Sequence, residues 1–242
     1  MVMVIKSNVP SNIIANPDGW NPPFTTDGLL YAGIYGRGNL SKNFAPGGAD
    51  VIVMGSPVVS NHFASFDFNN FIETGIKTTK ETTLVTISKC INTAKRQYFI
   101  SSYRGMSDAG RSLVTDTGNP NLVVYSHYKD TTTDVSSVQY AATELEIKDG
   151  SPAFMYGRDT GKKLTIWNMT SQKGANVTVP GNAESFVNSA LTYRIGRSKT
   201  SEVPEASTTA AALIFDRALS DAEIQAIYDY FKAYFARRGI NI

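Results

Sequence analysis

The sequence predicts an all-β fold, a two-sheet antiparallel jelly-roll sandwich with one α-helix at its C-terminal end. Runs of β-branched and aromatic residues recur at short intervals along most of the chain, a pattern typical of sandwiches and jelly rolls. The 19 glycines and 10 prolines supply turn residues between these runs. A length of 242 residues suits one large sandwich, because all-β domains often reach it as a single unit.

The first 49 residues are predicted to form a turn-rich N-terminal arm, followed by the jelly-roll domain over residues 50–242. Asn16–Gly19 and Pro46–Gly48 consist of residues that favour turns, through a fixed φ or through tolerance of a positive φ. We therefore expect an extended arm that reaches a neighbouring subunit, and not a separate domain.

Strands are predicted where β-branched and aromatic residues gather between turn signals. Residues 83–88 alternate apolar and polar side chains only roughly, as expected of a strand covered on both faces or placed centrally in a sandwich. The predicted strands are Val51–Met54, Ala64–Phe68, Phe71–Thr74, Thr82–Ile91, Gln97–Ser101, Leu122–Tyr128, Val135–Ala141, Glu144–Ile147, Ala153–Gly157, Leu164–Met169, Val177–Val179, Leu191–Gly196 and Ala210–Phe215.

One helix is predicted over residues 221–238. Ser220 and Glu223 have the spacing of a capping box, in which the serine hydroxyl and the glutamate satisfy free backbone N–H groups. Gly239 offers a left-handed stop. Apolar residues then recur at three- and four-residue steps and predict one broad buried face, formed by Ile224, Ile227, Tyr228, Phe231, Tyr234 and Phe235.

The composition excludes several classes of function. A formal net charge of +2 gives no strong positive field, so nucleic-acid binding is not expected. With Cys90 as the single cysteine and only His62 and His127, neither an intrachain disulfide nor a zinc site built on cysteines or three histidines is available. Met1–Ile5 is apolar, but this run ends at Lys6, so we expect neither a signal peptide nor membrane insertion. We expect the protein to be made in a reducing cytoplasm.

The segment Ala210–Arg238 resembles the closing strand and helix of the concanavalin A-like, laminin G-type jelly rolls. In that family a final strand runs into an Arg-Ala-Leu-Ser turn and an acidic-capped helix; Arg217–Ser220 and Glu223 match these positions. Upstream, Phe71–Ile76 and Glu81–Val85 are similar to the opening strands of the same domain. The resemblance covers roughly residues 50–238, although in the middle of this range only the regular spacing of the predicted strands matches.

The glycine-rich stretch Asn39–Gly48 is similar to such domains in tailed-bacteriophage and prophage virion proteins. The resemblance implies a two-sheet sandwich whose family members mostly bind glycans or proteins. Some members hold calcium, and some relatives hydrolyse polysaccharides. Fold alone does not choose among these activities, so the sites are argued separately.

Glu144 and Glu146 are the catalytic candidates. Side chains at i and i+2 of a strand share a face about 7 Å apart, and retaining glycosidases use two carboxyl groups about 5–5.5 Å apart. The run distantly resembles the paired-glutamate strand of laminarinase-type glucanases, with Glu146 in place of an aspartate and Asp149 in place of a glutamate. The alternative is a solvated strand face that ends at the Asp149-Gly150 turn.

Two pairs of residues are candidates for calcium binding, Asp67 with Asn69 and Asp130 with Asp134. Calcium requires about 6–8 oxygen ligands, and neither pair is dense enough to define a site. The alternative is that these residues stabilise turns. No cofactor is predicted, and calcium is the only ion considered.

Aromatic residues give the carbohydrate-binding candidates. The apolar C–H faces of sugars pack on tyrosine and tryptophan rings, while polar side chains bond the hydroxyl groups. Tyr125 and His127 are predicted to share a strand face. The alternative is burial in the sandwich core. The candidates are Tyr103, Arg104, Tyr125, His127 and Trp167.

We therefore predict a non-enzymatic virion protein of a tailed phage, a tail, fibre or decoration component with a lectin-like domain. Its expected partners are virion proteins, host surface glycans and further copies of the chain, and it would assemble in the bacterial cytoplasm. One alternative is a glycoside hydrolase or lyase of surface polysaccharide that uses Glu144 and Glu146. Another is a purely structural virion protein that binds no sugar.

Overall fold

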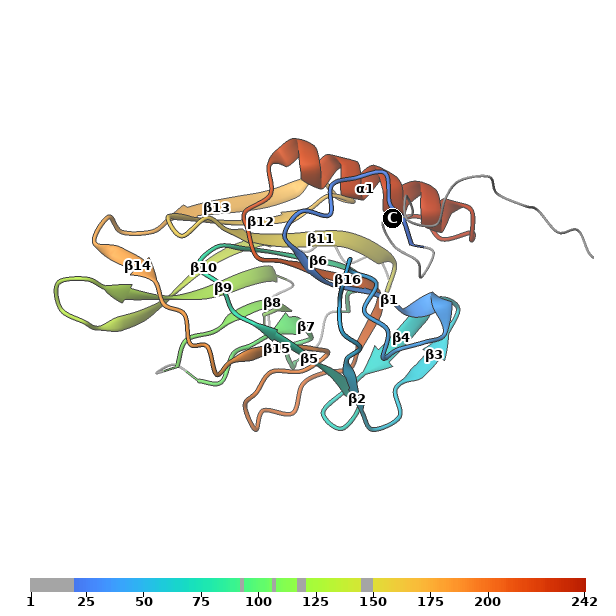
Figure 1. Cartoon of the computed structure of the whole chain (residues 1–242), viewed down its shortest axis with the longest axis horizontal. Coiled ribbons are helices and arrows are strands. Elements are labelled where there is room, and N and C mark those ends of the chain that lie inside the picture. Colours follow the sequence, from blue (N-terminus) through green and yellow to red (C-terminus); the bar gives the residue numbers. More distant parts are fainter. Residues whose placement is uncertain (1–19, 92–93, 106–107, 117–120, 145–149) are drawn as a thin grey trace, which may run out of the picture.

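The computed structural model describes residues 20–91, 94–105, 108–116, 121–144 and 150–242. Two antiparallel sheets pack face to face, and helix α1 (Asp221–Ala236) lies over the outer face of one of them (Figure 1). The prediction of an all-β sandwich with one C-terminal α-helix is confirmed over the described residues. None of the helices in this part of the chain is both long enough and apolar enough to span a membrane.

The sheet beneath α1 is called sheet A. Its strands follow the order β13-β12-β11-β6-β16-β4-β3, and β1 pairs with β16 as well. Sheet A consists of β1 (Leu29–Ile34), β3 (Val58–Ser60), β4 (Phe63–Phe66), β6 (Thr82–Lys89), β11 (Pro152–Asp159), β12 (Lys163–Asn168), β13 (Lys173–Thr178) and β16 (Ser207–Phe215).

The opposite sheet is called sheet B. Its strands follow the order β10-β9-β8-β7-β15-β5-β2, with β14 paired to β9. A 3-10 turn, η2 (Tyr35–Arg37), follows β1. Sheet B consists of β2 (Ile52–Met54), β5 (Phe71–Lys77), β7 (Tyr98–Ser101), β8 (Arg111–Thr115), β9 (Asn121–Asp130), β10 (Ser136–Glu144), β14 (Ala183–Ser185) and β15 (Thr192–Ile195).

Strand β6 is buried on both faces, which is one of the two arrangements expected for residues 83–88. Leu84 points into the core between the sheets. Val85 and Ile87 belong to a second cluster, which the apolar face of α1 completes. The helix therefore acts as a third layer, and this explains why the sequence of β6 alternates so weakly.

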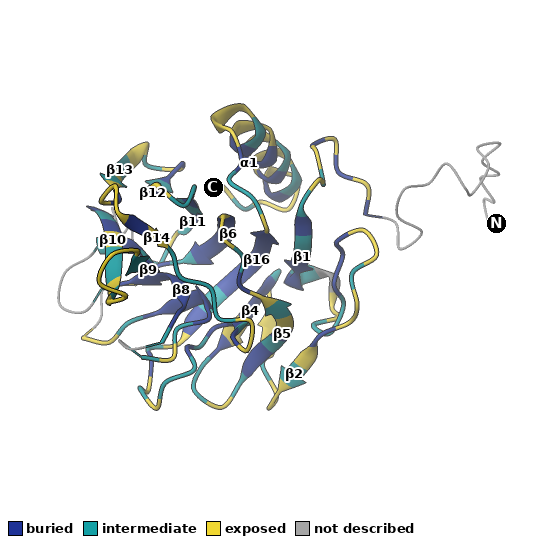
Figure 2. Cartoon of the chain, turned by 60° about the vertical axis from the view of Figure 1, so that its left-hand side comes forward, coloured by how far each residue is buried: buried dark blue, intermediate teal, exposed yellow. Residues whose placement is uncertain are grey.

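Helix α1 starts at the predicted capping box. The Ser220 side chain accepts a hydrogen bond from the Glu223 N–H, and the Glu223 carboxylate accepts one from the Ser220 N–H at 2.7 Å. Arg217 donates to the same carboxylate at 2.7 Å. Arg217 and the backbone N–H of Ser220 lower the pKa of Glu223 to about 2. The helix buries one face against sheet A (Figure 2), through Ile224, Ile227, Tyr228, Phe231 and Phe235.

The N-terminal boundary differs from the predicted arm over residues 1–49. Strand β1 pairs with β16 inside sheet A, and the Trp20 side chain is buried with its indole N–H 2.9 Å from the Tyr230 hydroxyl. Residues 20–49 therefore form part of the sandwich, because their apolar side chains cover the sheet beside α1. The remainder of the predicted arm, residues 1–19, lies outside the described residues.

Four strands of the described residues, β1, β3, β8 and β14, lie outside the predicted runs. Strand β1 is hidden among turn residues. Strand β8 is fully buried, but it begins with the polar residues Arg111 and Ser112, so the sequence did not indicate a strand there. Of the predicted strand at residues 144–147, Glu144 is the last residue of β10, and residues 145–147 lie outside the described residues.

A buried ion pair joins the two sheets. Arg111 of β8 donates to Asp159 of β11 at 3.1 Å, and both side chains are only 1% exposed. Ser126 and Tyr128 of β9 donate to the same carboxylate at 2.6 and 2.5 Å, as does the N–H of Gly161. Asp159 is therefore the acceptor on which donors from both sheets converge.

Removing one partner of this pair should destabilise the protein strongly. Asp159→Ala leaves the Arg111 guanidinium buried without its carboxylate, which should lower the free energy of unfolding by about 3–5 kcal/mol. The double variant Arg111→Met with Asp159→Leu should lose less than Asp159→Ala alone, because no unpaired charge is left behind. Chemical denaturation measures both, and an Asp159→Ala variant as stable as the wild type would contradict the role given to the pair.

The helix cap should make stability depend on acid. The pKa of Glu223 in the folded protein, about 2, lies below its usual value of 4.5. The carboxylate therefore stabilises the fold above pH 4.5, and this contribution is lost as the pH falls from 4.5 to about 2. We expect Glu223→Gln to melt at a lower temperature at neutral pH, with a loss of roughly 1 kcal/mol typical of a cap.

Thermal melts of the two proteins should converge as the pH falls towards 2. Glu184→Gln, which changes an exposed glutamate, is the control and should follow the wild type across the range. A gap between Glu223→Gln and wild type that stays constant with pH would show that the carboxylate charge is unimportant at this cap.

Candidate functional site

The two outer faces of the sandwich differ. Helix α1, together with Trp20, Phe24 and Phe44, covers the outer face of sheet A, whereas no helix of the described chain covers the outer face of sheet B (Figure 1). A sheet face that no helix covers can carry a binding surface at no cost to the core between the sheets. The candidate site lies on this face.

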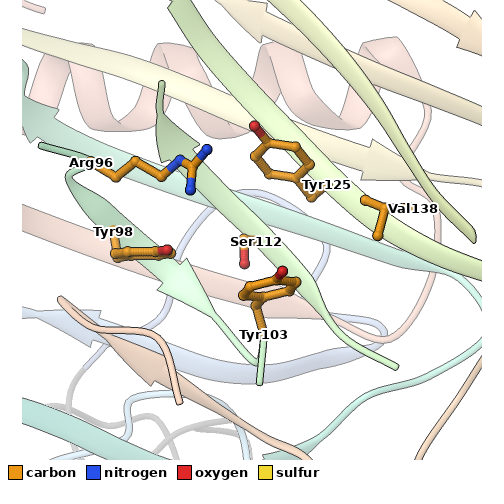
Figure 3. A pocket seen from close by; sticks show the side chains of 6 residues that line it. All are labelled: Arg96, Tyr98, Tyr103, Ser112, Tyr125 and Val138. Carbon is orange, nitrogen blue, oxygen red and sulfur yellow. The ribbon is translucent and has the colours of Figure 1, made fainter. Parts of the chain in front are cut away.

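A small cavity opens on strands β7 to β10. Its volume is about 140 Å³, and it is called the tyrosine pocket. Figure 3 shows Ser112 at its centre with tyrosine rings around it. The residues that line it are Arg96, Tyr98, Tyr103, Ser112, Tyr125 and Val138.

The strand register explains the hollow. Ser101, Ser112, Tyr125 and Tyr140 are successive cross-strand neighbours, and the two serine hydroxyls bond each other at 2.7 Å. Short serine side chains beside long tyrosines leave a depression in an otherwise filled face. Tyr140, at the edge of this row, is 58% exposed and its ring lies 5.9 Å from that of Tyr125.

Arg96 supplies the positive charge of the tyrosine pocket. Its guanidinium lies 3.4 Å from the Asp116 carboxylate and 3.8 Å from that of Glu202. It also lies 6.0 Å from the centre of the Tyr125 ring, within the range of a cation–π interaction. The charge is therefore held in place by neighbours while its guanidinium faces the pocket.

The tyrosine hydroxyls of the pocket keep their protons at neutral pH. Burial raises the pKa of Tyr98, and a hydrogen bond from its hydroxyl to Glu202 at 2.7 Å raises it further. Burial also raises the pKa of Tyr103 and of Tyr125. Each phenol can therefore donate a hydrogen bond to a ligand oxygen or to a protein acceptor.

The structure brings three of the five predicted carbohydrate candidates together. Tyr103 and Tyr125 line the tyrosine pocket, and the His127 ring stacks on Tyr103 with centroids 5.8 Å apart. His127 is fully buried, and its Nδ1 donates to the Gly110 carbonyl at 3.0 Å. His127 thus supports the Tyr103 ring from behind and does not line the cavity.

The other two candidates lie elsewhere. Arg104 is outside the tyrosine pocket and makes a two-pronged ion pair with Asp108, at 2.8 and 2.9 Å. Trp167 is on β12 of sheet A, on the opposite side of the sandwich. Conversely, the sequence did not single out Arg96, Tyr98 or Ser112. Arg96 lies two residues before Tyr98, the first residue of β7, and this spacing was the available signal that the two side chains share a face.

The catalytic candidates are not assembled into a site by the described residues. Glu144 is exposed at the end of β10. Glu146 lies outside the described residues, so its distance from Glu144 is not defined. The prediction of a carboxylate pair therefore stays a prediction.

The calcium candidates have turn-forming partners. Asp67 accepts hydrogen bonds from the N–H groups of Asn69 and Asn70, which hold the turn between β4 and β5. Asp130 accepts from the N–H groups of Thr132 and Thr133. Asp134 pairs with Lys129 at 2.7 Å. Among the described residues, no group of three or more His, Cys, Asp or Glu side chains is placed to hold a metal ion.

Comparison with known proteins adds information on the fold. No protein-family model and no curated protein matches the chain. Solved structures of botulinum neurotoxin receptor-binding domains do match. The type G domain superposes with a TM-score of 0.59 at 14% identity, over 85% of this chain and 52% of that chain. The serotype D domain superposes with a TM-score of 0.58 at 12% identity, over 84% and 52%.

A third match is to botulinum neurotoxin type C, whose entry into cells is dependent upon interaction with two ganglioside molecules; its TM-score is 0.56 at 10% identity, over 84% and 51%. The chain spans about half the length of these structures. At such identities the likeness shows the fold alone, a two-sheet β-sandwich that fits the predicted jelly roll. None of these three matches is a phage virion protein.

Proposed function

We propose that the chain is a non-enzymatic, lectin-like domain that binds glycans in the tyrosine pocket. The observation that carries the proposal is the arrangement of Tyr98, Tyr103 and Tyr125 around Ser112 on the sheet face that no helix covers.

The chemistry of the pocket suits a sugar ring. Tyrosine rings offer apolar surface to the C–H face of a pyranose, and phenol and guanidinium groups donate hydrogen bonds to its hydroxyls. The volume of about 140 Å³ is below the ~300–1,000 Å³ of sites that enclose drug-sized ligands. The pocket therefore suits one sugar unit at the end of a glycan, with Tyr140 beside it for the next unit.

The structural neighbours support this ligand class. The type G neighbour is a receptor-binding domain, and cell entry of the type C neurotoxin is dependent upon interaction with two ganglioside molecules. Gangliosides carry glycan headgroups. Because the chain spans only half of these domains, the likeness does not locate their ganglioside contacts, and the proposal rests on the tyrosine pocket of this chain.

Filling the tyrosine pocket, or removing one of its aromatic rings, should weaken glycan binding. Ser112→Leu puts a larger side chain at the centre of the tyrosine pocket, and Tyr125→Ala removes one ring. On a glycan array we expect the wild type to bind a restricted set of glycans, and both variants to lose at least tenfold in affinity. That loss equals about 1.4 kcal/mol, within the range of one aromatic contact.

Tyr234→Phe, a change on the distant helix, is the matched control and should bind as the wild type does. Thermal melts show whether Ser112→Leu and Tyr125→Ala remain folded. Wild-type silence on the array would overturn glycan binding. Release of new reducing ends from a bound polysaccharide, abolished by Glu144→Gln with Glu146→Gln, would overturn the non-enzymatic part and favour the hydrolase.

We further propose that the chain works within the virion of a tailed phage, as an oligomer assembled in the bacterial cytoplasm. The support is the sequence resemblance of Asn39–Gly48 to phage and prophage virion domains. The chain should then co-purify in fixed stoichiometry with phage particles on a density gradient. If the host strain expresses the chain but the washed phage particles lack it, the proposed virion role is contradicted.

A further inference from the structure

A second groove lies on the opposite side of the sandwich, between the first turns of α1 and the outer strands of sheet A. Its volume is about 290 Å³, twice that of the tyrosine pocket. It is called the tryptophan groove, and the residues that matter to its chemistry are Tyr156, Arg158, Trp167, Asn176, Ile224 and Gln225.

Trp167 forms an aromatic platform in this groove. It lies between Tyr156 of β11 and Gly174 of β13 as their cross-strand partner. The six-membered part of the indole lies directly over Gly174, where an added Cβ would be only 1.8 Å from Cε3. The missing side chain of Gly174 thus lets the ring lie down on the edge strand. The ring is only partly buried, so part of its surface faces the groove.

Polar groups surround the platform. Arg158 pairs with Asp221 at 2.7 Å and donates to the Leu219 carbonyl at 2.6 Å, so its position is fixed. Asn176 is exposed and its Oδ1 accepts from Thr165 at 2.7 Å, which turns the amide nitrogen away from that contact. Gln225 on α1 is exposed as well. Carboxamides and a guanidinium beside a flat ring are the donors and acceptors that sugar hydroxyls require.

From this arrangement we propose that the tryptophan groove is a second carbohydrate-binding site, which takes a pyranose unit stacked on Trp167. The inference takes its ligand class from the proposed function but stands on different residues, on the other sheet. A domain with one site on each outer face can bridge two glycans and so gain avidity without further contacts.

The test uses the two tryptophans of the chain as probes of the full-length protein. The indole N–H signal of Trp167 reports on the groove. Trp20, buried at 3% exposure and bonded to Tyr230, is an internal reference. Glucose, galactose, N-acetylglucosamine and N-acetylneuraminic acid are titrated separately to millimolar concentration, with Trp167→Phe to assign the signals.

We expect at least one of these sugars to shift the Trp167 signal in a saturable manner and to leave the Trp20 signal in place. Gly174→Ala, which drives the ring off the strand, should abolish that shift, whereas the neighbouring Lys173→Ala should preserve it. Tyr125→Ala should leave the shift unchanged, because the tyrosine pocket is on the other face. An unchanged Trp20 signal in each variant shows that the fold is intact.

Absence of a saturable shift at Trp167 with all four sugars would overturn the second site. If glycan binding that depends on Tyr125 persists in that case, the proposed function stands without it. If Tyr125→Ala abolishes the Trp167 shift, the groove is not an independent site and the inference also fails. A shift at Trp167 together with array binding that ignores Tyr125 would support the groove and overturn the tyrosine pocket.

Discussion

The buried Arg111–Asp159 pair is the interaction on which the rest of the molecule depends. It is the charged contact that ties β8 of sheet B to β11 of sheet A, and a charge left unpaired between two sheets would be costly. The pair therefore favours one placement of β8 relative to sheet A. Since Ser126 and Tyr128 bond the same carboxylate, β9 is fixed with β8. Ser112 and Tyr125 of the tyrosine pocket lie on the outer face of these same two strands.

Local patterns were predictable because their causes are local. The capping box of α1 needs only Ser220 and Glu223, which are three residues apart, and it is present as expected. The double burial of β6 was readable from its weak alternation. The burial of strand β8 was not predictable from the sequence. Its first residue, Arg111, has the character of a surface residue, and its buried partner Asp159 lies 48 positions later in the chain.

The candidate site was predictable only in part, for the same reason. Tyr103 and Tyr125 were singled out as aromatic residues beside polar ones, and both line the tyrosine pocket. Ser112 carries no signal of its own: it matters because it lies on β8, between Ser101 of β7 and Tyr125 of β9, and β8 is a strand that the sequence did not indicate. Trp167 was grouped with these tyrosines by composition, although the sheet that holds it faces the other way.

Alternation along the strands explains how one core can support two different outer faces. On β8, Arg111 points inward to Asp159 while Ser112 points outward to the floor of the tyrosine pocket. On β12, Ile166 lies in the core and Trp167 lies on the outer face. A shift of one residue in register would bury the outward residues and expose the charged ones, so it is strongly opposed. The core therefore fixes where the outward side chains stand without fixing what they are, which leaves both faces free to acquire a ligand.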